Sequence, residues 1–217
     1  MKEQSIIQQV VRGMQKLSHP SDYWKTSPIH FPELEAAKRV SQRNNQSVFE
    51  HTMSVIDHLS EESAASLLSG LFHDLGKCVV PVGCDPSSSK FPGHPEASAI
   101  IAKETLMRWG CAPHVVDCVC RIVSTHMYDI MNGLQEKTIR KFIASVGPKN
   151  VEKWFVLRIA DSRSYQSHQQ YYCQYIQPFK LAVETYLDGQ PRVEIVSFPE
   201  MDSGSSGGIQ IKGGDAS

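Results

Sequence analysis

The sequence predicts an all-α protein with a single helical domain. Apolar residues recur three and four positions apart along most of the chain, whereas strand patterns are nearly absent before residue 193. The 217 residues, 41% of them hydrophobic, suffice for one domain with a substantial core. We therefore expect one helical bundle.

The first helices follow from apolar spacing. Residues 6–14 predict an amphipathic helix that opens the chain. Three prolines and the polar run SQRNNQS make 18–46 an irregular connection around one short helix near 32–40. The apolar stripe of 48–59 predicts the next helix. Residues 61–72 predict another, with acidic side chains in its first turn and a glycine beyond its end.

The second half of the chain continues the helical pattern. Residues 79–93 are rich in Pro, Gly and Ser and predict a loop. A proline at the first helical position opens the helices predicted at 95–110 and 113–126. Further periodic segments predict helices at 134–144, 151–170 and 177–187. Residues 193–198 and 209–212 predict either a short C-terminal hairpin or, given their Gly/Ser-rich connection, a disordered tail.

Composition indicates a cytoplasmic protein without a membrane partner. The N-terminus does not resemble a signal peptide, and no apolar run approaches membrane-spanning length. The six cysteines are scattered and indicate reduced thiols. The formal net charge of −1 gives no overall basic field, so nucleic acid is not favoured as a partner. Oligomeric state has no signal in the sequence.

The stretch LFHDLGKC, residues 71–78, crowds His73, Asp74 and Lys77 around Gly76 at the edge of a core. Such polar groups are costly to desolvate unless they bind something. His51 lies on the apolar stripe of its own predicted helix.

Two further polar residues fall on apolar stripes of other predicted helices. His126 ends the stripe of the helix that begins at Pro113, and Asp161 follows Leu157 by four residues. A buried carboxylate needs a charged partner or a metal, so these spacings predict that the groups meet.

These residues resemble the metal-dependent phosphohydrolases of the HD-domain superfamily. FHDLGK is similar to that family's HD-x-G-K core, VFEHT to its first-histidine segment, and RIADSRS to its closing helix. GHPEASA is similar to a segment found in the HD domains of bacterial CCA-adding tRNA nucleotidyltransferases. The resemblance covers about residues 46–165 and implies an HD-domain helical bundle standing alone.

The resemblance implies a division of the chain into three parts. Residues 1–45 would form an N-terminal helix and connection packed on the core, 46–190 the HD phosphohydrolase domain, and 191–217 a flexible, Gly/Ser-rich extension.

The resemblance also implies a divalent metal centre. The implied ligands are His51, His73, Asp74 and Asp161 for one tight ion, with His94 and His126 serving a second metal or the substrate. Such mixed ligands suit Mn, Fe, Co, Ni or Zn. A metal lowers the pKa of bound water toward about 7 and so supplies a nucleophile at neutral pH. Asp74 would orient or deprotonate that water.

Cations near these residues are candidates for binding a substrate phosphate. Lys77 follows His73 by four residues, so its ammonium could offset charge on a phosphoryl group. Arg163 and Arg121 are further candidates, although neither shares a helix face with its neighbouring metal residue at ideal spacing.

The sequence therefore predicts a phosphohydrolase that cleaves a phosphomonoester or phosphodiester. The resemblance implies that its substrate is a nucleotide or a 2′,3′-cyclic phosphate. One alternative is an HD-type single-strand nuclease, which would need a basic groove. The other is a non-catalytic HD module that binds or regulates a partner.

Overall fold

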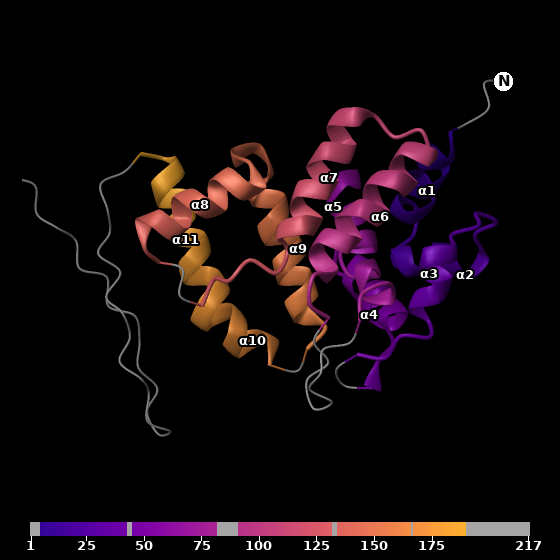
Figure 1. Cartoon of the computed structure of the whole chain (residues 1–217), viewed down its shortest axis with the longest axis horizontal. Coiled ribbons are helices and arrows are strands. Elements are labelled where there is room, and N and C mark those ends of the chain that lie inside the picture. The colour runs from indigo at the N-terminus through magenta and orange to yellow at the C-terminus, as the bar shows by residue number, and fades with distance from the viewer. Residues whose placement is uncertain (1–4, 43–44, 82–90, 132–133, 166, 190–217) are drawn as a thin grey trace, which may run out of the picture.

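The computed structural model describes residues 5–42, 45–81, 91–131, 134–165 and 167–189 (Figure 1). These residues form helices and contain no strand, since Ser41 and Ser47 make only an isolated antiparallel bridge. The predicted all-α class is confirmed. The hairpin or tail predicted at 193–212 lies outside the described residues.

The described helices succeed one another with short connections. The α-helices are α1 (Ile6–Gln15), α2 (Tyr23–Thr26), α3 (Pro32–Ala37), α4 (Val48–Asp57), α5 (Ala64–Phe72), α6 (His94–Arg108), α7 (Pro113–Thr125), α8 (Glu136–Val146), α9 (Val151–Arg163), α10 (His168–Tyr171) and α11 (Gln177–Leu187). The 3₁₀-helices are η1 (Pro20–Asp22), η3 (Leu75–Cys78) and η4 (Pro148–Asn150), and η5 (Tyr172–Ile176) is a π-helical turn.

One buried hydrophobic cluster extends through the helices. In Figure 1 the early helices α1 to α4 lie at one end and α8, α10 and α11 at the other, with α9 between them. Helix α9 packs against α4 and α5, and α6 packs against α7 and η3. Aromatic side chains pack together in two groups within this cluster: Trp24, Phe31, Phe72 and Trp109 in one, and Phe142, Trp154, Phe155 and Phe179 in the other. None of the described helices is long and apolar enough to cross a bilayer.

Three sequence-based boundaries were wrong. The connection at 18–46 was predicted to contain one short helix, but it contains η1 and α2 as well as α3. The turn that starts at Pro20 is too short to show a periodic apolar pattern, so it left no sign in the sequence. Helix α5 begins at Ala64, since the Ser63 hydroxyl caps it, and so the acidic residues precede the helix. Helix α9 ends at Arg163 instead of continuing to residue 170.

Gly76 does not end a helix, although its position after the predicted helix at 61–72 suggests that it would. It lies inside η3 without a positive φ. A Cβ added to it would collide with the carbonyl oxygen of His94 and the backbone nitrogen of Ser98. The Gly76 N–H also donates to Ser98 Oγ at 2.8 Å. Glycine therefore allows η3 to lie directly against the first turns of α6.

Candidate metal centre

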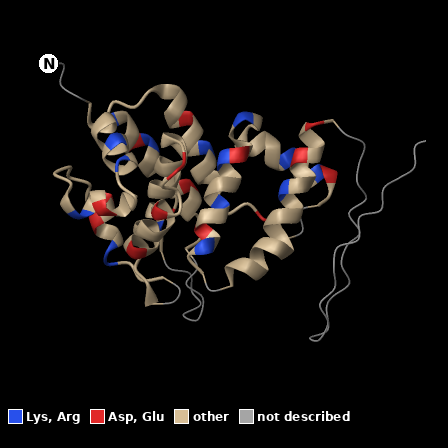
Figure 2. Cartoon of the chain, turned by 180° about the vertical axis from the view of Figure 1, so that it is seen from behind, with Lys and Arg blue, Asp and Glu red and all other residues tan. Residues whose placement is uncertain are grey.

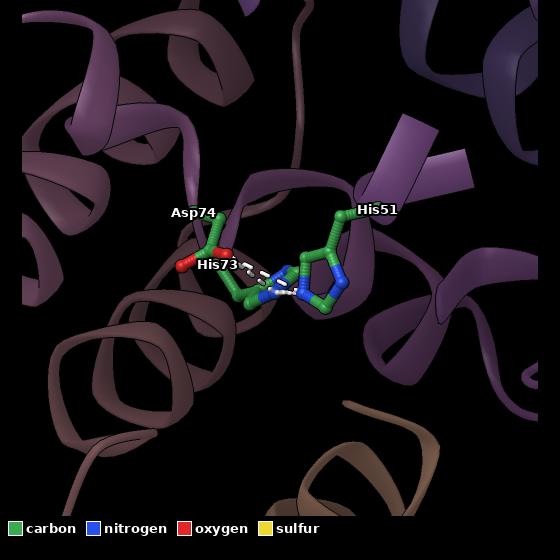
Figure 3. Close-up of side chains that lie close together, drawn as sticks. All are labelled: His51, His73 and Asp74. Atoms are coloured by element: carbon green, nitrogen blue, oxygen red, sulfur yellow. Dashed lines mark hydrogen bonds and ion pairs between the residues drawn. The ribbon is translucent and has the colours of Figure 1, made fainter. Parts of the chain in front are cut away.

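Local capping fixes the two segments that carry the first histidines. Ser47 and Glu50 form a reciprocal capping box at the start of α4, which holds His51 on the buried face of that helix. His73 ends α5 as its C-cap, and Asp74 follows at the turn into η3. All three site residues are at least 98% buried, and Figure 3 shows their side chains converging from the two segments.

The two carboxylate oxygens of Asp74 face different pairs of histidines. Oδ2 lies 3.4 Å from His51 Nε2 and 3.3 Å from His73 Nε2. Oδ1 lies 3.3 Å from His94 Nε2 and 3.6 Å from His126 Nε2. Each pair forms with Asp74 a group of buried ligand atoms close enough to hold a metal ion. One carboxylate therefore lies between two adjoining ligand sets.

Hydrogen bonds to the backbone orient three of the rings. Nδ1 of His73, His94 and His126 donates in each case to the carbonyl oxygen three residues earlier, at 2.7 Å. Since a carbonyl oxygen only accepts, each Nδ1 carries a hydrogen. In a neutral ring, Nε2 then presents its lone pair to the cluster, which is the form that binds a metal.

Ser164 holds His51 in the same tautomer. The Ser164 hydroxyl donates to the Asp161 carbonyl oxygen at 2.6 Å, so its oxygen is left to accept from His51 Nδ1 at 3.0 Å. The Tyr165 ring lies beside the His51 ring, with centroids 5.5 Å apart. The turn that ends α9 therefore contributes an orienting contact to a histidine of α4.

The paired histidine nitrogens fit a bound cation. His51 Nε2 and His73 Nε2 are 3.2 Å apart, as are His94 Nε2 and His126 Nε2. Because neutral rings in this tautomer direct two lone pairs at each other, each contact is repulsive unless a proton or a metal ion lies there. Imidazole and carboxylate ligands together suit divalent transition metals.

Asp161 lies on the side of His51, outside both groups of candidate ligand atoms. Its Oδ1 lies 3.1 Å from His51 Nε2 and 4.0 Å from His73 Nε2. Arg158, one turn earlier on α9, reaches both halves of the centre: Nη1 donates to the His126 carbonyl oxygen at 3.2 Å and lies 3.8 Å from Asp161 Oδ2. Its Nη2 donates to the Tyr171 hydroxyl.

The electrostatics favour ionised carboxylates. Burial would raise the pKa of Asp74, but His73 and Lys77 together hold that pKa well below its ordinary value. The pKa of Asp161 is likewise lowered against its burial, mainly by His51. Both carboxylates are therefore available as metal ligands at neutral pH.

The pKa values of His126 and His73 shift in opposite directions. Burial lowers the pKa of His126 and so favours the neutral ring that a metal requires. For His73 burial acts in the same direction, but the charges of Asp74 and Asp161 prevail and raise its pKa. A proton on His73 would occupy the place that a metal ion would take.

Lys77 lies directly against Asp74. Its Nζ is 2.6 Å from Asp74 Oδ2 and donates to Gln42 Oε1 at 2.7 Å. The side chains of Lys77, Asp161, Arg158 and His94 are 12%, 13%, 11% and 10% exposed, so each of these groups keeps slight access to solvent. Lys77 and Arg158 are cations, and their positive charge favours an anionic ligand.

The structure does not bring the other two arginines into this cluster. Arg121 is exposed, pairs with Asp117 at 3.0 Å, and lines a surface hollow with Lys149 and Lys153. Arg163 is exposed at the end of α9. Both remain predictions as phosphate ligands.

Sequence reasoning missed several residues that support the centre. Gln42 gave no signal, because its position depends on a contact with a distant segment. Ser98 and Ser164 lie within GHPEASA and RIADSRS, but no role was predicted for either residue, because their partners Gly76 and His51 belong to other segments. Arg158 could have been found, since it precedes Asp161 by three residues on one helix.

Comparison with known protein families identifies the segment that carries the buried histidines and aspartates. A family model described as HD domain matches residues 46–162, which is more than half of the chain. The match includes every histidine and aspartate of the cluster and leaves Gln42 and Tyr171 outside it. No curated protein matches the chain.

Proposed function

Because the chain belongs to the HD domain family, we propose that it is a metal-dependent phosphohydrolase that cleaves a phosphomonoester or phosphodiester. The observation that carries the proposal is Asp74, whose two oxygens each face a pair of buried histidine nitrogens. A divalent ion held there would polarise a phosphoryl oxygen and lower the pKa of water.

The chain's own residues take distinct roles in this proposal. His51, His73 and Asp161 would hold one ion and His94 and His126 a second, with Asp74 contributing to both sets. Asp74 also orients the attacking water, since it is held ionised by its neighbours. The carbonyl-bound rings keep their ligand nitrogens fixed, so little reorganisation is needed when substrate binds.

Cations beside the two aspartates are proposed to receive the substrate phosphate. Lys77 and Arg158 approach the cluster beside Asp74 and Asp161. On the molecule as a whole, acidic and basic side chains are interspersed along the helices, as Figure 2 shows from behind. This local concentration of donors favours a compact phosphorylated molecule as the substrate. We propose a nucleotide or a 2′,3′-cyclic phosphate, which is the substrate class implied by the resemblance of GHPEASA to the HD domains of CCA-adding enzymes.

Hydrolysis of a substrate panel tests the proposal. Release of inorganic phosphate reports cleavage of phosphomonoesters, and chromatography of the nucleoside monophosphate product reports opening of a cyclic phosphodiester. The metal-loaded full chain is assayed with nucleoside mono-, di- and triphosphates and with 2′,3′-cyclic nucleotides, in the presence of Mn, Fe, Co, Ni or Zn. We expect hydrolysis of at least one class, absent in the Asp74→Ala variant. No hydrolysis by protein shown to hold metal would refute the proposal and make single-stranded DNA or RNA the next substrate.

Lys77→Ala is expected to reduce turnover far more than metal content. Removing a cation that stabilises developing phosphoryl charge should lower kcat/KM by about 100-fold, with metal content changed by less than about twofold. Metal analysis and steady-state kinetics on the same preparation measure both quantities. Lys25→Ala is the matched control, because Lys25 forms an exposed ion pair with Asp22. Equal loss of metal and turnover would instead make Lys77 a structural partner of Asp74.

A further inference from the structure

Gln42 lies beside the metal centre although it precedes the segment matched by the family model. Its backbone N–H donates to the Gln46 carbonyl oxygen at 2.8 Å, and the residue is only 6% exposed. The side-chain Oε1 accepts a hydrogen bond from Lys77 Nζ at 2.7 Å. Gln42 is thus one hydrogen bond from the cation that contacts Asp74.

The contact with Lys77 fixes the direction of the Gln42 amide. An ammonium group only donates hydrogen bonds, so the amide oxygen of Gln42 must face Lys77. The amide nitrogen, Nε2, therefore points away from Lys77. That Nε2 is buried and has no hydrogen-bond partner among the described residues. A buried N–H₂ without an acceptor is unfavourable, which indicates that a ligand or water supplies one.

The chemistry of the surroundings selects the kind of acceptor. Lys77 uses two of its three hydrogens on Asp74 and Gln42, which leaves one for a ligand. The ammonium of Lys77 and the neutral amide of Gln42 therefore offer donors from two neighbouring side chains beside the centre. A group with several anionic oxygens, such as a phosphoryl group, can accept from both at once.

We propose that Gln42 binds the substrate by donating its Nε2–H to a non-bridging phosphoryl oxygen, beside Lys77. This inference rests on the proposed function and adds to it a binding residue from outside the family segment. The substrate class it fits carries an accessible phosphoryl group with at least two free oxygens.

Binding of inorganic phosphate to the metal-loaded full chain tests the inference. Gln42→Glu keeps the size of the side chain and an oxygen for Lys77, but it replaces the donor by a negative oxygen. We expect phosphate to bind at least about 10-fold more weakly to this variant, and also more weakly to Gln42→Ala. Gln8→Glu, at an exposed position on α1, is the charge-matched control and should bind as the wild type does.

Titration calorimetry gives the phosphate affinity, and metal analysis of each sample separates loss of phosphate from loss of metal. With an active substrate, KM should rise more than kcat falls. Wild-type phosphate affinity in both Gln42 variants would overturn the inference, as would failure of the metal-loaded wild type to bind phosphate. Gln42-dependent phosphate binding without hydrolysis of any substrate would refute the proposed function while keeping the phosphate site.

Discussion

Replacing Asp74 by alanine is expected to abolish hydrolysis and to remove bound metal. The substitution deletes the only group that faces both histidine pairs of the described cluster. Without the carboxylate, two sets of neutral imidazoles remain, and they offset the charge of a divalent ion poorly. We expect activity to fall by more than about 1,000-fold, because the metal and the residue that orients water are lost together.

The Asp74→Asn variant tests the charge of this side chain separately from its size, in the same measurements of hydrolysis and bound metal. Asparagine fills nearly the same volume but carries no charge and presents an N–H₂ to one histidine pair. We expect it to lose metal almost as completely as alanine while the helical circular dichroism stays unchanged. Asp117→Ala, which removes an exposed carboxylate paired with Arg121, is the control and should retain metal and activity. Full activity in either Asp74 variant would contradict the assigned role.

Gly76→Ala is expected to have the largest effect on stability. The added methyl group would overlap the His94 carbonyl oxygen and the Ser98 backbone nitrogen, and it would lie 2.8 Å from Ser98 Oγ. Backbone atoms of α6 cannot turn aside as a flexible side chain would, so η3 and α6 must separate. We expect the free energy of unfolding to fall by about 3 kcal/mol or more.

Gly93→Ala provides the comparison for Gly76. Gly93 has a φ of 79°, and no described atom lies within 4 Å of the place where a Cβ would stand, so alanine there adds backbone strain without a collision. That strain is expected to cost about 1 kcal/mol. Urea denaturation of the apo proteins measures both values. A Gly76→Ala protein as stable as Gly93→Ala would show that η3 and α6 do not need their close contact.

The parts of the fold that follow from periodicity were predictable. Helices α1, α4, α6, α7 and α11 occur close to where apolar spacing and proline positions predict them. Helix α2 was not predictable in this way, because a four-residue turn carries no repeat and forms where Tyr23 and Trp24 pack on the core.

The residues of the candidate site also differ in whether the sequence alone could predict them. His51, His126 and Asp161 were recognisable because a polar residue on an apolar stripe must lie in the core. Gln42 was not recognisable, since it belongs to the polar run SQRNNQS and its partner Lys77 lies 35 residues further on. Spacing reveals residues whose own helix directs them inward, whereas contacts between distant segments require the structure.

The number of divalent ions bound per chain decides whether Asp74 lies between two metal sites. The purified protein is stripped with chelator, reloaded separately with Mn, Fe, Co, Ni or Zn, freed of excess metal and analysed. We expect two ions per wild-type chain, one in His94→Ala, and no tightly bound ion in Asp74→Ala. A wild-type chain that retains none of the five metals, or an Asp74→Ala chain that retains two ions, would contradict this expectation.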